Sequence, residues 1–119
     1  MSINEQIIQA VTPVVLTCVP EPYQPNEGDA VSTYCTFTYT EMPDNFGDDQ
    51  PEVIRYLIRL SYYAPLIGAD GESNNTLSTR KALRRAIFAA GFTYPSVENL
   101  TDDVSQRFDF EFEGWDGEV

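Results

Sequence analysis

Four carboxylates gather in one short segment, and calcium binding is the chemistry that such a group could perform. Asp44, Asp48, Asp49 and Glu52 lie in the run MPDNFGDDQPE, residues 42–52. A calcium loop needs ligands at fixed alternate offsets around a glycine, and this run does not keep those offsets. We therefore expect a metal-free acidic loop, in which Asp48 and Asp49 serve the structure or an interface.

Catalytic chemistry has few candidates elsewhere in the sequence. The 119 residues include no histidine, which is the commonest general base near neutral pH and the commonest metal ligand. The sequence also lacks a glycine-rich phosphate loop, a CxxC pair and a nucleophile elbow. An acid–base or metal enzyme built on Asp48, Asp49 and Glu52 is therefore the weakest interpretation, and we expect no catalytic residues and no cofactor.

Charge and cysteine content limit the possible partners and compartment. Seven Lys and Arg against nineteen Asp and Glu give a formal net charge of -12, which disfavours binding to bare phosphate backbones. Cys18 and Cys35 could meet across adjacent strands, but no secretory signal opens the chain, so we expect two buried free thiols in a cytoplasmic product. No apolar run approaches the roughly 20 residues that a membrane span requires.

Apolar periodicity predicts the elements that must position any site. It indicates a single α+β domain over residues 1–119, with a mostly antiparallel four-stranded sheet and two helices in the order α-β-β-β-α-β. The longest strand, 53–64, is apolar at its even positions and is expected to be central. The other predicted strands are 14–19, 33–41 and 106–113, the predicted helices are 3–11 and 77–90, and a loop of about a dozen residues is expected from Tyr94.

One buried face is expected to join the strands to the second helix. The alternation in 106–113 directs three phenylalanines inward, toward the even positions of the central strand and the apolar stripe of the helix. The predicted shared core consists of Ile54, Ile58, Leu60, Leu83, Ile87, Phe108, Phe110 and Phe112.

Most of the positive charge lies on the second predicted helix. Arg80, Lys81, Arg84 and Arg85 are four of the seven cations of the chain, and Phe88 lies among them. Such a face can be a solvated surface or a contact for an acidic partner. An aromatic side chain beside arginines has the composition of an interface anchor, so we favour a contact.

Several patterns, in their order along the chain, resemble the small tail-completion proteins of tailed bacteriophages, the tail-terminator and head-to-tail joining class. They are TYCTFTYTEMPDNFGDDQP at 33–51, IRLSYYAPL at 58–66, ALRRAIFAAGFTYP at 82–95 and RFDFEFEG at 107–114. The resemblance implies a virion protein that forms a ring, commonly a hexamer, at the head-proximal end of the tail tube and joins it to the head connector. DNA would pass through the lumen without specific binding, and no catalytic residues would be carried over.

The long connections between elements agree with an assembly role. Four of them reach about ten residues, and long ordered loops commonly serve a contact. The alternative interpretation is a small monomeric or dimeric α+β module that binds a ligand or a regulatory partner.

Overall fold

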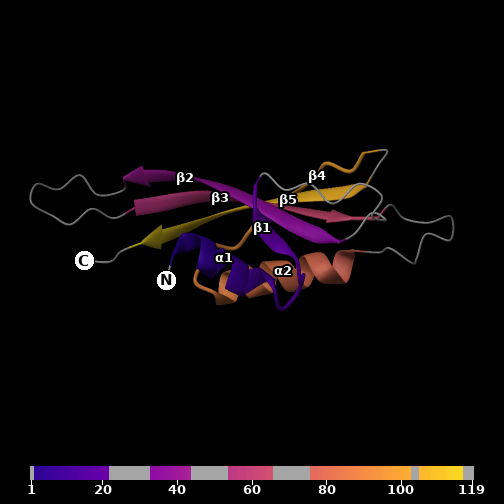
Figure 1. Ribbon diagram of the computed structural model, residues 1–119, viewed down its shortest axis with the longest axis horizontal. Helices are drawn as coiled ribbons and strands as arrows, with labels where there is room; N and C mark the ends of the chain where they lie inside the picture. Colours follow the sequence, from indigo (N-terminus) through magenta and orange to yellow (C-terminus); the bar gives the residue numbers. More distant parts are fainter. Residues whose placement is uncertain (1, 22–32, 44–53, 66–75, 103–104, 117–119) are drawn as a thin grey trace, which may run out of the picture.

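The computed structural model describes residues 2–21, 33–43, 54–65, 76–102 and 105–116. Within these ranges the chain forms two helices and five strands (Figure 1). In chain order they are α1 (Ile3–Val11), β1 (Cys18–Pro20), β2 (Tyr34–Pro43), β3 (Ile54–Ala64), α2 (Leu77–Ala89), β4 (Ser96–Asn99) and β5 (Gln106–Asp116).

The β3 strand lies at the centre of the sheet, as its length and apolar face predict. It pairs antiparallel with β2 on one side and with β5 on the other. The register places Leu60 between Phe37 and Phe110, so apolar positions of the three strands share one face.

The sheet has one more strand than the sequence predicts, and it is mixed. The strand order is β1-β2-β3-β5-β4, and β1 runs parallel to β2. The expected loop after Tyr94 contains β4, whose sequence SVEN has only one strong strand former, so pairing with β5 and not propensity makes it a strand. The predicted α+β class with two helices is confirmed, whereas the sheet has five strands instead of the predicted four and is mixed because the β1–β2 pair is parallel.

The first strand also begins later than predicted. The chain continues to turn after α1, because the N–H groups of Val14 and Val15 both donate to the carbonyl of Val11. The largely β-branched run at 14–17 therefore leads out of a helix end, and pairing begins only at Cys18.

Local capping explains the start of α1 and the end of α2. The Ser2 hydroxyl accepts a hydrogen bond from the Glu5 N–H at 3.2 Å, which confirms the predicted start of α1. Thr76 stands at the N-cap of α2 but makes no side-chain cap bond; its hydroxyl lies 3.2 Å from Gln106 Oε1 on β5. Gly91, with φ of 101°, follows the end of α2 and takes the left-handed conformation that glycine tolerates.

Both helices pack on the same side of the sheet, below it in the view of Figure 1. The predicted core is confirmed there, with Ile54 partly buried at its margin. The opposite side of β2, β3 and β5, here called the open face, carries their alternate residues. None of the described helices has the length and apolar character needed to cross a membrane.

Candidate interaction surfaces

A stripe with a basic centre runs along α2 outside its core-facing side, and its members are exposed except for Arg84, which is half-buried. Its members recur at helical spacing, whereas Leu83 and Ile87 point into the core. Leu77 is 45% exposed and Phe88 is 58% exposed, so the stripe carries apolar side chains near both ends. We call this set the α2 stripe: Leu77, Lys81, Arg84, Arg85 and Phe88.

A second aromatic ring extends the α2 stripe beyond the helix. The ring centroids of Phe88 and Tyr94 lie 5.7 Å apart in an edge-to-face arrangement, and Tyr94 is 58% exposed. Sequence reasoning assigned Tyr94 to a loop and missed this pair. Exposed paired aromatics are typical anchors of protein interfaces, so Tyr94 belongs with the candidate surface.

Arg80 is not part of this surface, although the sequence grouped it with the other cations. Its guanidinium carbon lies 4.1 Å from the centroid of the Phe108 ring, and its Nε donates to the Thr76 hydroxyl at 3.3 Å. The structure therefore brings Lys81, Arg84, Arg85 and Phe88 together on α2 and directs Arg80 toward β5.

The cations of the chain divide into two groups. The three arginines of the sheet face carboxylates: Arg55 lies 3.8 Å from Glu113, Arg59 lies 3.2 Å from Glu111, and Arg107 lies 3.0 Å from Asp109. Within the described residues, none of the four cations on α2 has an acidic partner, and the buried Arg84 Nε has no hydrogen-bond partner. The positive charge that the fold leaves unpaired in those residues is therefore concentrated on α2.

Asp48 and Asp49, like Asp44 and Glu52, lie outside the described residues. Across the described residues, no group of three or more Cys, Asp or Glu side chains is placed to hold a metal ion.

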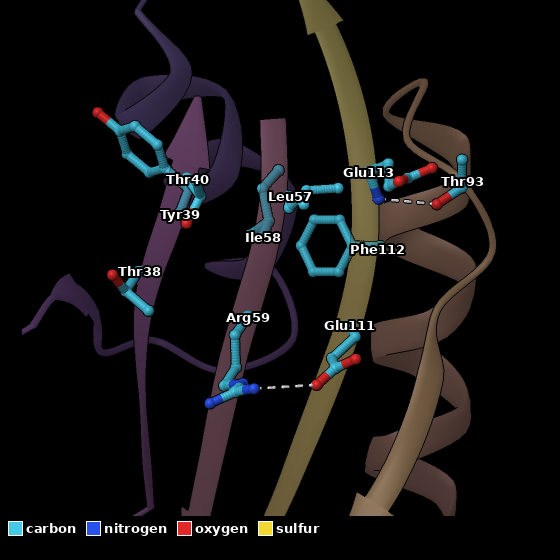
Figure 2. A pocket seen from close by; sticks show the side chains of 10 residues that line it. All are labelled: Thr38, Tyr39, Thr40, Leu57, Ile58, Arg59, Thr93, Glu111, Phe112 and Glu113. Atoms are coloured by element: carbon cyan, nitrogen blue, oxygen red, sulfur yellow. Dashed lines mark hydrogen bonds and ion pairs between the residues drawn. The ribbon is translucent and has the colours of Figure 1, made fainter. Parts of the chain in front are cut away.

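A shallow trough of about 620 Å³ crosses the open face of the sheet. The register forms two rows there, one of Thr38, Arg59 and Glu111, and one of Thr40, Leu57 and Glu113. Figure 2 shows Arg59 and Glu111 pointing toward one another, and the Glu113 N–H donating to the Thr93 hydroxyl at 2.8 Å. The other lining residues are Tyr39, Ile58, Thr93 and Phe112.

A buried polar row lies next to the trough on the same face. The register aligns Thr36, Ser61 and Asp109, which are all at least 96% buried. Arg107 donates two hydrogen bonds to Asp109, which raises the pKa of the guanidinium, and Thr36 Oγ1 lies 3.4 Å from Glu21 Oε1. These bonds satisfy the side chains of Asp109 and Thr36, whereas the buried Ser61 Oγ has no hydrogen-bond partner among the described residues.

The two cysteines are free and buried, and they are opposite one another in the β1–β2 register. Burial raises the pKa of Cys18 from its ordinary 9.0 to about 12, and raises the pKa of Cys35 further in the same direction. Both thiols therefore stay protonated near neutral pH and are poor nucleophiles.

No protein-family model matches the chain, and no curated protein matches it significantly in sequence.

Proposed function

We propose that this protein is a non-enzymatic structural subunit of a phage virion, a tail-terminator or tail-completion protein. It forms a ring, in the simplest case a hexamer, at the head-proximal end of the tail and joins the tail tube to the head connector. DNA passes through the lumen without specific binding. The α2 stripe serves as the contact for an acidic surface of a neighbouring copy or of a tail or connector protein.

The division of the cations is the observation that carries this proposal. A subunit of net charge -12 resists association with other acidic subunits unless its cations lie at the contacts. In the described residues, the sheet arginines are paired within the fold while those of the α2 stripe are left for another molecule. Phe88 and Tyr94 add apolar area beside these charges, as interface anchors do.

The trough on the open face favours a second candidate function. Its volume suits a small ligand, and it presents two threonine hydroxyls beside an arginine. A monomeric or dimeric binding module would use this trough and would leave the α2 stripe solvated.

A double charge reversal on α2 tests the proposal. Arg84→Glu with Arg85→Glu places two negative charges where an acidic partner must approach, so we expect a folded protein that fails to form rings or to complete tails. Native mass in solution and electron micrographs of tails measure the two losses. Arg84→Lys with Arg85→Lys retains the charge and serves as the matched control.

Salt provides an independent check on the same contact. Ionic strength near 1 M shortens the screening length to about 3 Å, so it should weaken assembly of the wild-type protein. Normal assembly by the folded Glu variant, at low and at high salt, would return these charges to the solvent and contradict the proposed contact.

A further inference from the structure

One edge of the sheet is only partly covered. The Cys35 N–H donates to the Thr17 carbonyl, and the Phe37 carbonyl accepts from the Glu21 N–H, so odd residues of β2 direct their backbone groups outward. The β1 strand pairs with β2 no further than Phe37. Among the described residues, the outward N–H and C=O groups of Tyr39 and Glu41 have no partner. These two residues define the free β2 edge.

The opposite edge of the sheet is formed by β4. The Leu100 N–H donates to the Arg107 carbonyl, so even residues of this segment bond toward β5 and odd residues bond outward. The backbone groups of Val97 and Asn99 therefore point away from the sheet, and no described residue pairs with them. Each edge thus offers two donors and two acceptors.

We infer that β4 of one copy pairs antiparallel with the free β2 edge of the next copy, so that the sheets join into one continuous sheet around the ring. This inference rests on the proposed function and names the contact between copies. The strand directions fit this pairing. The pairs β2–β3, β3–β5 and β5–β4 are all antiparallel, so β4 runs opposite to β2, and β4 of one copy is antiparallel to β2 of the next.

The two edges also agree in which side of the sheet their residues face. Tyr39 and Val97 both pack against the core on the helix side. The pairs Val97–Glu41 and Asn99–Tyr39 can therefore exchange both backbone hydrogen bonds while all helices stay on one side of the joined sheet. This head-to-tail contact repeats around a closed ring.

The register of this contact gives a strand tilt that a closed sheet can have. Within one copy, Val97 aligns with Phe37 through β5 and β3, whereas the contact aligns it with Glu41 of the neighbour. Each copy is thus displaced along the strand direction by four residues, or about 13 Å. Across the sheet, each copy adds four strands, or about 19 Å. The resulting tilt of about 35° is at the lower end of the range for closed barrels.

The direction of the displacement places the helices outside the ring. The sheet is viewed here from the helix side with β2 pointing upward. In this view the chirality of L-residues puts the free β2 edge on the right, so the next copy lies to the right. Because its Val97 aligns with Glu41 and not with Phe37, that copy is shifted upward. With this shift, the strands coil around the ring axis in a right-handed sense if the helices are outside and in a left-handed sense if they are inside. The right-handed twist of β-strands favours the arrangement with the helices outside. The open face with Thr38 and Thr40 then lines the lumen, and both helices lie in the outer layer, beside the helices of the adjacent copies, so the α2 stripe stays available to a neighbouring copy.

A disulfide between copies tests the register directly. In the inferred contact, Glu98 and Thr40 form a non-hydrogen-bonded pair with Cα atoms about 4.5 Å apart, within disulfide range. Within one copy the strands of these residues are about 14 Å apart, and Glu98 aligns with Thr36, so Thr40 lies about 13 Å further along its strand and the two residues are about 19 Å apart. Mild oxidation of the Thr40→Cys, Glu98→Cys variant should therefore produce covalent oligomers up to the full ring on a non-reducing gel.

A register control and a backbone variant complete the test. Thr38→Cys with Glu98→Cys shifts one thiol by two residues and should cross-link at least tenfold less. Glu41→Pro removes only an outward N–H, so it should leave the monomer folded and abolish rings. Rings that form without cross-links, equal cross-linking of both cysteine pairs, or rings of the Glu41→Pro variant would overturn the contact and leave the proposed function standing. A wild-type protein that never assembles would overturn both.

Discussion

At the scale of single residues, the core depends on a few fully buried side chains. Phe110 has no exposed surface and lies opposite Leu60 in the centre of the sheet, on the face that the helices cover. The two-residue period of β5 was enough to identify it, because alternation along a half-buried strand directly encodes which side chains face the core.

Phe110→Ala should lower the free energy of unfolding by about 3 to 5 kcal/mol, because it removes a large buried ring and leaves a cavity. Urea unfolding followed by circular dichroism measures the change. Phe88→Ala is the matched control, and since Phe88 is largely exposed, its effect should stay below about 1 kcal/mol in the monomer. Equal effects of the two substitutions would contradict the assigned core.

Stability should fall above about pH 9 because of the two thiols. The unfolded chain loses these protons from about pH 9, whereas folded Cys18 keeps its proton to about pH 12 and Cys35 is shifted in the same direction. The unfolded state therefore binds fewer protons in this window, and the free energy of unfolding decreases as pH rises. Between pH 8 and pH 10 each thiol should contribute a loss of about 1 kcal/mol.

The difference from a Cys18→Ala, Cys35→Ala variant isolates this contribution from the tyrosines and lysine that titrate nearby. Urea unfolding of both proteins in reducing buffer should give a shallower pH dependence for the variant. Identical slopes would mean that the thiols are not buried in the folded state.

The candidate surface was only partly predictable from residue types. Helical spacing correctly grouped Lys81, Arg84, Arg85 and Phe88. Arg80 fits the same composition, but packing against Phe108 removes it from the surface. The ring of Tyr94 joins Phe88 through a turn after the helix, and no periodicity encodes a contact made by a turn.

At the scale of elements, segments with a strong apolar periodicity were predicted and short segments were not. The helices and the three long strands were predicted to within a few residues, because each carries a complete apolar face. The four-residue β4 carries too little pattern to be seen, and it exists because β5 offers an edge with which it can pair.

The end of β5 shows a related tertiary effect. The alternating pattern predicted an end of this strand at Glu113, before a mostly polar tail, yet the strand continues through Gly114 to Asp116. A Cβ atom at residue 114 would lie 2.6 Å from Cδ1 of the Phe92 ring. The glycine thus makes room for a buried ring from the segment after α2 and does not end the strand.

Gly114→Ala should therefore lower the free energy of unfolding by about 1 to 3 kcal/mol, through overpacking against Phe92. A double-mutant cycle with Phe92→Leu distinguishes this contact from a general effect on the strand. The combined variant should lose less stability than the two single variants together. Strict additivity would show that the ring does not press on residue 114.

At the scale of the whole molecule, charge and edges point to the same kind of function. The chain carries excess negative charge, while in the described residues its unpaired cations lie on one helix. In the same described residues, both edges of the sheet, at β2 and at β4, present backbone groups without partners. The sequence alone indicated the charged helix, but the edges depend on strand order and on the length of β1, which are properties of the folded sheet.

The most direct test of the ring is the native mass of the purified full-length protein across a wide concentration range, with negative-stain images of the same samples. We expect a single closed species of fixed stoichiometry, seen as rings with a central channel, which disappears in the Arg84→Glu, Arg85→Glu variant or in high salt. A monomer or dimer at every concentration, unchanged when purified tails are added, would contradict the assembly role and favour the binding module.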